Sequence, residues 1–231
     1  MRAFIAILTI VVAGCGLNAP RNDVGAKYLG AAYVLDSLGE GSGYDPDPLI
    51  RFDAFDCTTF VETVLADGDV ERLNKIRYAD GVIGFENRNH FIETDWLPNN
   101  ADLLENVSAK YGDTNIRHVV VDKSAWARAV HGMKIDALPV AADIEYIPYD
   151  AIKSINNAKP LIVLFMVGMS EKSVKIGTDI SVVHMGFLLP GGKTLRHAST
   201  GRGVVDDDFT QYILRRQNMP NNIGIALVEI K

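Results

Sequence analysis

Asp56-Cys57-Thr58-Thr59-Phe60-Val61-Glu62 opens an amphipathic run in this 231-residue chain. Asp56 is of a type that caps helices, so the run predicts a helix that begins at Cys57. Its apolar positions recur at the spacing of one helix face: Cys57, Phe60, Val61, Val64 and Leu65. Free N–H groups and the helix dipole at that end favour a thiolate. Cys57 is either a nucleophile or a small core residue.

Near the other end of the chain, two β-rich runs flank Pro190-Gly191-Gly192. The runs, residues 181–189 and 193–199, predict an antiparallel hairpin. A loop of two or four residues places Gly186 opposite His197. Alternate residues share a face, so His184 then lies on the face of His197, in a diagonal position about 7–8 Å away. A three-residue loop would put the two histidines on opposite faces.

A helix-opening cysteine followed by a hairpin with two histidines follows the plan of papain-like cysteine hydrolases. Three segments carry a closer resemblance, namely D-C-T-T-F-V-E from Asp56, R-N-H-F-I-E-T-D-W from Arg88, and H-M-G-F with R-H-A-S from His184. Together they resemble the N-acetylmuramoyl-L-alanine amidase-like branch of the NlpC superfamily of cell-wall cysteine hydrolases, over roughly residues 45–230. The resemblance implies that Cys57 is the nucleophile, His184 the general base and His197 the residue that orients His184.

The activity implied by this resemblance is that of an amidase. It would cleave the bond between N-acetylmuramic acid and L-alanine in peptidoglycan fragments, without a cofactor. Two alternatives stay open, an endopeptidase that cuts within the stem peptide and a non-catalytic wall-binding lipoprotein on the same fold. Cys57, the two hairpin histidines and His90 are also possible zinc ligands. However, Cys57 has no second cysteine nearby and there is no close-spaced ligand pair, so we predict no metal.

A polar segment between the predicted helix and the hairpin, residues 78–96, supplies candidate substrate contacts. Arg88 has the forked geometry that binds a carboxylate, and Trp96 offers an apolar face to a sugar ring. The resemblance implies a substrate-facing role for part of this segment, and the predicted binding residues are Arg88, Asn89, His90 and Trp96. The alternative is a polar loop with one packed tryptophan. His131 lacks a motif context and is interpreted as a structural or surface residue.

The first residues predict export and a lipid anchor. A mostly apolar stretch follows Arg2, and Val12-Ala13-Gly14-Cys15 resembles the lipobox of bacterial lipoproteins. The stretch is shorter than the roughly 20 apolar residues of a membrane-spanning helix. We therefore expect a signal peptide over residues 1–14, lipidation of Cys15 and a tether over residues 15–26. The alternative is an ordinary secretory signal that is cut elsewhere.

Such an anchor would hold the protein to a membrane on the periplasmic side of a bacterial cell envelope. No aspartate follows Cys15. By resemblance to lipoprotein sorting, this favours the outer membrane where the cell has one. The charge balance of 23 Lys and Arg against 29 Asp and Glu, a net charge of −6, includes no basic cluster. We therefore predict no nucleic-acid partner.

The remaining pattern predicts an α+β fold over residues 27–231, in which the Cys57 helix packs on an antiparallel sheet of at least four strands, and the resemblance implies that this fold is papain-like. With 48% hydrophobic residues, the chain can form one substantial core. The hairpin supplies two of the strands, and continuous apolar runs over residues 161–167 and 223–230 supply two more. A helix is predicted over residues 26–38, whereas residues 139–150 have no clear assignment.

Overall fold

The computed structural model describes residues 24–231, which form a mixed α and β fold around one large antiparallel sheet. The strands are β1 (Ala32–Tyr33), β2 (Ala54–Phe55), β3 (Leu104–Asn106), β4 (Asn115–Val121), β5 (Val140–Pro148), β6 (Leu161–Val167), β7 (Val182–Leu188), β8 (Thr194–Ser199), β9 (Gly203–Asp208) and β10 (Asn222–Ile230). The α-helices are α1 (Cys57–Leu65), α2 (Val70–Arg77), α3 (Leu97–Asn99), α4 (Lys123–Trp126), α5 (Glu171–Ile176) and α6 (Phe209–Gln217). Two π-helical turns cover Ile92–Trp96 and Ala127–His131, and 3₁₀ turns cover Ala26–Tyr28, Ala79–Gly81, Phe85–Asn87, Ser108–Lys110 and Tyr149–Ala151.

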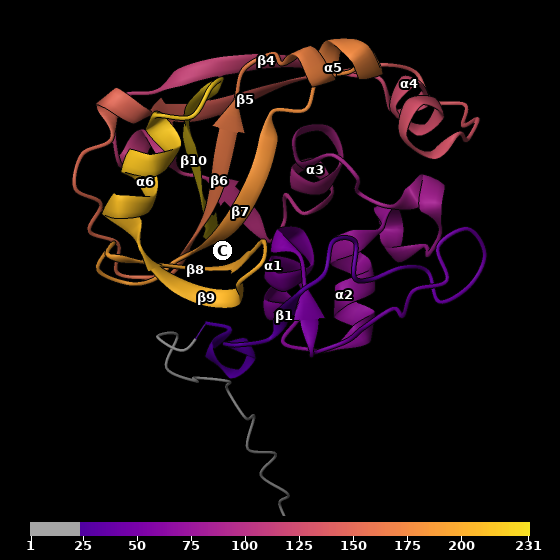
Figure 1. The fold of residues 1–231 in the computed structure, drawn as a ribbon, viewed down its shortest axis with the longest axis horizontal. Coiled ribbons are helices and arrows are strands. Elements are labelled where there is room, and N and C mark those ends of the chain that lie inside the picture. Colours follow the sequence, from indigo (N-terminus) through magenta and orange to yellow (C-terminus); the bar gives the residue numbers. More distant parts are fainter. Residues whose placement is uncertain (1–23) are drawn as a thin grey trace, which may run out of the picture.

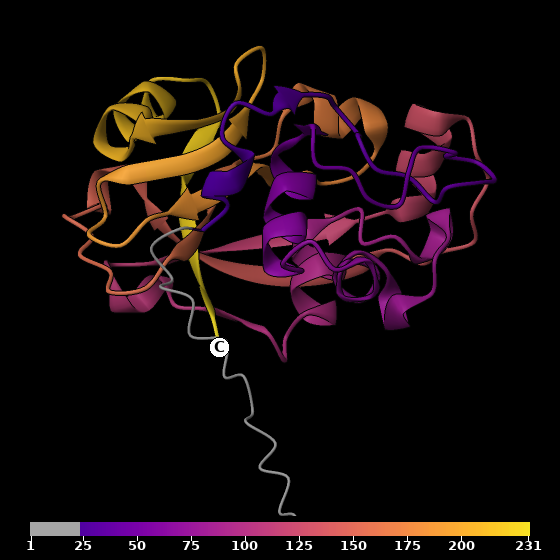
Figure 2. The same ribbon diagram turned by 90° about the horizontal axis from the view of Figure 1, so that it is seen from below.

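The main sheet has eight strands in the order β4-β5-β10-β6-β7-β8-β9, with β3 paired to β10 beyond the end of β5. Helices α1 and α2 lie to one side of the sheet and α6 lies to the other (Figures 1 and 2). None of the helices within residues 24–231 is both long enough and apolar enough to cross a membrane. The predicted signal peptide, Cys15 and most of the predicted tether lie outside the described residues.

The central strand β6 explains why its sequence is a continuous apolar run. Ile162, Leu164 and Met166 enter the core beneath α1, whereas the alternate residues enter the core beneath α6. A strand that is covered on both faces needs apolar side chains at every position. The predicted strands at residues 161–167 and 223–230 are confirmed as β6 and β10.

Helix α1 begins at Cys57, as the sequence predicts. A capping box forms there: the Asp56 carboxylate accepts a hydrogen bond from the Thr59 N–H at 2.8 Å, and the Thr59 hydroxyl accepts one from the Asp56 N–H at 2.9 Å. The helix packs on the hairpin strands β7 and β8, where Phe60 meets Phe187 edge to face. The hairpin sheet thus supports the end of the helix that carries the cysteine.

The register of the β7–β8 hairpin is the one expected for a loop of two or four residues, and not for one of three. Phe187 pairs with Arg196 and Leu188 with Leu195. A Cβ atom added to Gly186 would lie 2.6 Å from the Cβ of His197, so only glycine fits opposite that histidine. The two predicted histidines therefore project from the same face.

Two parts of the sequence-based assignment differ from the structure. The helix predicted over residues 26–38 is wrong, because only a 3₁₀ turn forms before the short strand β1. Gly30 adopts a positive φ, and its N–H donates to the carbonyl of Val204 instead of continuing a helix. The unassigned residues 139–150 include β5, whose pairing with β4 extends the sheet.

Candidate active site

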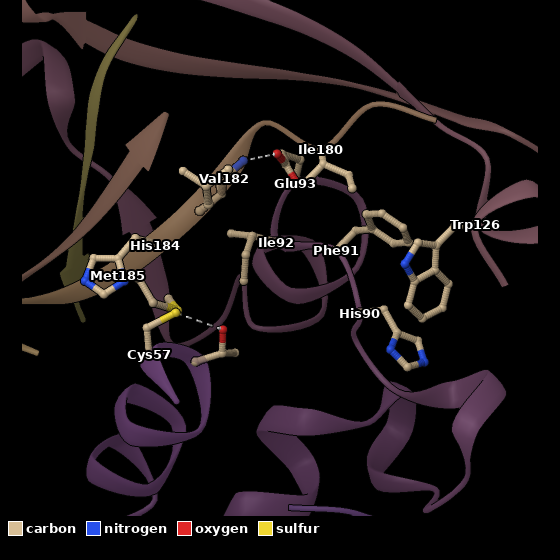
Figure 3. A pocket seen from close by; sticks show the side chains of 12 residues that line it. Cys57, His90, Phe91, Ile92, Glu93, Trp126, Ile180, Val182, His184 and Met185 are labelled. Atoms are coloured by element: carbon tan, nitrogen blue, oxygen red, sulfur yellow. Dashed lines mark hydrogen bonds between the residues drawn. The ribbon is translucent and has the colours of Figure 1, made fainter. Parts of the chain in front are cut away.

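Cys57 lies at the free end of α1 and lines a cavity of about 190 Å³ together with His184 and Met185 (Figure 3). It is a free, half-buried cysteine whose Sγ lies 3.9 Å from the hydroxyl of Thr58. The structure describes no backbone partner for the N–H groups of Cys57 and Thr58, as is usual in the first turn of a helix. The thiol therefore sits beside two donors that are directed out of the helix end.

The environment of this thiol does not favour the thiolate that its helix position alone predicts. Burial, and after it the carboxylate of Asp56, raise the pKa of Cys57 to about 11. The capping carboxylate lies at the positive end of the helix dipole and opposes its effect on the sulfur. Burial outweighs the helix end in this balance, so Cys57 needs a base to become a nucleophile, as the resemblance implies.

The two hairpin histidines meet as predicted. Nε2 of His184 on β7 and Nδ1 of His197 on β8 are 2.6 Å apart. A β-bulge at Val183 interrupts the pairing of β6 with β7 next to His184. His197 is completely buried, and the ring of Tyr212 from α6 lies edge-on to it. The sheet and α6 thus hold both imidazole rings in one arrangement.

A carboxylate that the sequence analysis did not identify completes this chain of side chains. Asp207 Oδ2 on β9 is 3.1 Å from His197 Nε2, and Arg202 forms two hydrogen bonds of 2.9 Å to the same carboxylate. Strands β8 and β9 pair His197 with Val205, which places Asp207 diagonally across on the same face. Predicting this contact needs the register of a second hairpin, in which Asp206, Asp207 and Asp208 are adjacent and alike.

The Asp207 carboxylate determines which ring nitrogens carry protons. The hydrogen bonds of Arg202 lower the pKa of Asp207, so Asp207 is ionised and accepts a hydrogen bond from the Nε2–H group of His197. Nδ1 of neutral His197 is then an acceptor, and Nε2 of His184 must donate to it. This leaves Nδ1 of His184 unprotonated, and it is the one ring nitrogen of that residue available to Cys57.

Both histidines are neutral at rest. Burial, followed by the proximity of His197, lowers the pKa of His184 to about 3. Burial also lowers the pKa of His197, against the opposing effect of Asp207. The resting arrangement at pH 7 is therefore a thiol, two neutral imidazoles and one carboxylate. It can accept the thiol proton at the moment when the sulfur attacks.

The residues predicted to bind substrate have mixed positions. Trp96 is completely buried in the core beneath α1, so its role as a sugar platform is wrong. Arg88 is buried and already bound to carboxylates, with Nε 2.8 Å from Glu40 and Nη2 2.5 Å from Asp45. Its predicted role as a clamp for a substrate carboxylate is therefore wrong as well. The buried Asn89 donates to the carbonyl of Ile76 at 2.9 Å and has a structural role.

His90 is the one of these four residues that lines the cavity of Cys57. It belongs to an aromatic cluster that consists of Phe85, His90, Phe91, Trp126 and His131. The half-buried Trp126 is its centre, and with His90 it also lines a second cavity of about 300 Å³. Trp126 lies in a segment without a motif, so no sequence pattern favours it over Trp96.

Within the part of the chain that the structure describes, no three or more His, Cys, Asp or Glu side chains are arranged to hold a metal ion. His90 Nε2 contacts the carbonyl of Phe85 at 2.8 Å, and Nδ1 of His197 contacts His184. The four residues considered as zinc ligands in the sequence analysis are thus not assembled around one point.

Residues 23–220 match the AmiA-like family, described as N-acetylmuramoyl-L-alanine amidase-like. The chain belongs to this family. A protein from Legionella pneumophila has a similar structure, with a TM-score of 0.81, 23% identity, and coverage of 91% of this chain and 87% of that one. An N-acetylmuramoyl-L-alanine amidase from Bacteroides uniformis has a TM-score of 0.69 and 23% identity, over 91% of this chain and 97% of its own. No curated protein matches the sequence. At these identities the two structures show a shared fold.

Proposed function

We propose that this AmiA-like protein is a cysteine amidase of the papain-like NlpC superfamily that cleaves the amide between N-acetylmuramic acid and L-alanine in peptidoglycan fragments. The observation that carries the proposal is the chain from Asp207 through His197 to His184, which ends in an unprotonated nitrogen at the cavity of Cys57. Membership in an amidase-like family supports the choice of bond.

In the first step, Nδ1 of His184 takes the thiol proton while Sγ of Cys57 attacks the carbonyl carbon of the lactyl group. The sulfur–carbon bond forms as the carbonyl π electrons move to its oxygen. The backbone N–H of Cys57 at the free end of α1 is in a position to stabilise the resulting oxyanion. The hydrogen bond from Nε2 of His184 to His197, which Asp207 holds in turn, keeps the His184 ring in place while Nδ1 carries the proton.

In the second step, the imidazolium of His184 returns its proton to the nitrogen of alanine as the carbon–nitrogen bond breaks. The peptide leaves with a free amino group, and the sugar remains as a thioester on Cys57. Water then attacks the thioester carbon with His184 again as the base, and the carbon–sulfur bond breaks as His184 returns that proton to the sulfur. This releases the lactyl carboxyl group and restores the thiol, so the same nitrogen acts as base and then as acid in each half of the reaction.

The alternative activity is that of an endopeptidase that cuts within the stem peptide, since the same catalytic groups can attack any amide. The test is mass spectrometry of muropeptides digested by the wild type and by a folded Cys57→Ala variant. An amidase releases a peptide that begins with alanine and a sugar that carries a free lactyl group. Cleavage between the second and third residues of the stem would replace the amidase proposal with the endopeptidase.

We also propose that Cys15 is lipidated and anchors the protein on the periplasmic side of the cell envelope, where peptidoglycan fragments are present. The lipobox-like Val12-Ala13-Gly14-Cys15 supports this proposal. Cys15→Ser should move the protein out of the detergent phase in a partition experiment, because the acyl chains supply the membrane affinity. Equal partition of wild type and variant would leave an ordinary secretory signal as the explanation.

A further inference from the structure

Glu93 is a buried carboxylate in the wall of the Cys57 cavity that the proposed catalytic steps do not use. Its Oε1 atom accepts two backbone hydrogen bonds, from Ser181 at 3.0 Å and from Val182 at 2.8 Å. Figure 3 shows the one from Val182. No other residue within the described range 24–231 donates a hydrogen bond to Oε2. A carboxylate oxygen in the wall of a cavity is a strong acceptor for a donor on a ligand.

The aromatic cluster forms another part of the wall of the same cavity. Figure 3 shows His90, Phe91 and Trp126 on the side away from Cys57 and His184, with Glu93 between the two ends. The Trp126 ring is held by Phe85, which stacks parallel to it at 5.9 Å, and by His90 at 4.5 Å. A fixed aromatic surface and a nearby acceptor together suit a ring that has one apolar face and donors on its rim.

The charges around the second cavity argue against an anionic ligand beside Trp126. The second cavity, which shares His90 and Trp126 with the first, is lined by the carboxylates Asp36, Asp56 and Glu62. Its two arginines are bound to carboxylates, since Arg77 pairs with Glu62 at 2.9 Å and Arg88 with Glu40. A stem peptide that carries free carboxylates would be repelled here, whereas an uncharged sugar would not.

We propose that the cavity between Glu93 and Trp126 is a saccharide subsite, in which a pyranose ring packs on the aromatic cluster and donates a hydroxyl or acetamido hydrogen bond to Glu93. The inference rests on the proposed amidase function and names the side of the scissile bond that this cavity holds. The sugar half of the substrate lies toward Trp126, and the reacting carbonyl lies at Cys57. Glu93 and Trp126 thereby become residues that determine specificity.

Intrinsic fluorescence provides a direct test, because the chain has two tryptophans and Trp96 is completely buried. The binding experiment uses the full-length Cys57→Ala protein, which keeps ligands intact. The sugar probe is the uncharged methylamide of N-acetylmuramic acid, and the peptide probe is L-alanyl-D-isoglutamine. Trp126→Phe in the same background is the matched control, since it leaves Trp96 as the sole emitter.

We expect the sugar probe to change the emission and to protect it from acrylamide quenching, and we expect the peptide probe to do neither. Trp126→Phe should abolish the response. Glu93→Gln retains an oxygen for Ser181 and Val182, and it should weaken sugar binding by about tenfold through loss of the charged acceptor. A thermal unfolding curve for each variant shows whether it is folded.

Protection of Trp126 by the peptide probe, or by neither probe, would overturn the saccharide subsite. Unchanged sugar affinity in folded Glu93→Gln would remove Glu93 from it. Amide cleavage is measured separately with the wild type. Sugar binding without cleavage would contradict the amidase proposal and leave the subsite in place, whereas cleavage without sugar binding would do the reverse.

Discussion

The β7–β8 hairpin and the segment that begins at Arg88 both carry polar residues that resemble a family motif. The hydrogen bonds of these residues differ between the two regions. In the hairpin, each hydrogen bond determines the next, and one nitrogen of His184 remains for the cavity. Around Arg88, the guanidinium donates to Glu40, Asp45 and Asp36, so four of its five N–H groups are already used. An unused hydrogen-bonding position at a cavity indicates chemistry, whereas a buried group whose donors are almost all paired indicates a structural role.

The largest effect in this comparison should come from the two residues that react. Cys57→Ala and His184→Ala should each remove essentially all amide cleavage, because members of a catalytic unit act together and not additively. Turnover of a defined muropeptide, measured alongside the thermal unfolding midpoint, provides the check. Substantial turnover by a folded Cys57→Ala protein would falsify the role of the thiol.

Asp207→Asn tests the far end of the histidine chain. The amide can donate where the carboxylate accepts, so His197 would change tautomer and His184 would lose its orientation. We expect kcat to fall by about 100-fold or more, with a much smaller change in KM. Arg202→Ala keeps the carboxylate and is the matched control, with a milder loss. Equal kcat values for Asp207→Asn and the wild type would limit the catalytic unit to Cys57, His184 and His197.

Arg88→Ala should act on stability and not on chemistry. It leaves the carboxylates of the buried Glu40 and the half-buried Asp45 without their cation, which should cost about 3–5 kcal/mol of unfolding free energy. Arg51→Ala removes an arginine that pairs with the exposed Asp53 and should change stability little. Chemical denaturation of both variants measures the difference. A stable Arg88→Ala protein with a raised KM would instead support the substrate clamp that the sequence indicates.

The smallest expected effect is that of pH on kcat/KM. The pKa of Cys57 is raised to about 11 and that of His184 is lowered to about 3, so neither group of the free enzyme titrates near neutrality. Between these values kcat/KM should vary little with pH, and alkylation of Cys57 by iodoacetamide should be slow at pH 7 and accelerate toward pH 11. An inflection of kcat/KM between pH 6 and 7 would indicate a resting thiolate and imidazolium.

Local patterns in the sequence were sufficient to predict the parts of the fold that depend on residues close together in the chain. The α1 start follows from Asp56 and the apolar spacing, and the hairpin register follows from its turn. The carboxylate of Asp207 could not be predicted, because its contact with His197 depends on a second register. Sequence patterns could not show that Trp126, and not Trp96, lines the cavity. Both are isolated tryptophans, and only their burial in the tertiary structure distinguishes them.

The most direct test of the central claim is to trap the acyl-enzyme. A muropeptide reaction quenched rapidly in acid, followed by peptide mass spectrometry, should show the N-acetylmuramoyl group attached to Cys57 through its lactyl carbonyl. The same peptide from Cys57→Ala should carry no adduct. A peptide acyl group on Cys57 would contradict the choice of bond, and turnover without any adduct on Cys57 would contradict the cysteine mechanism.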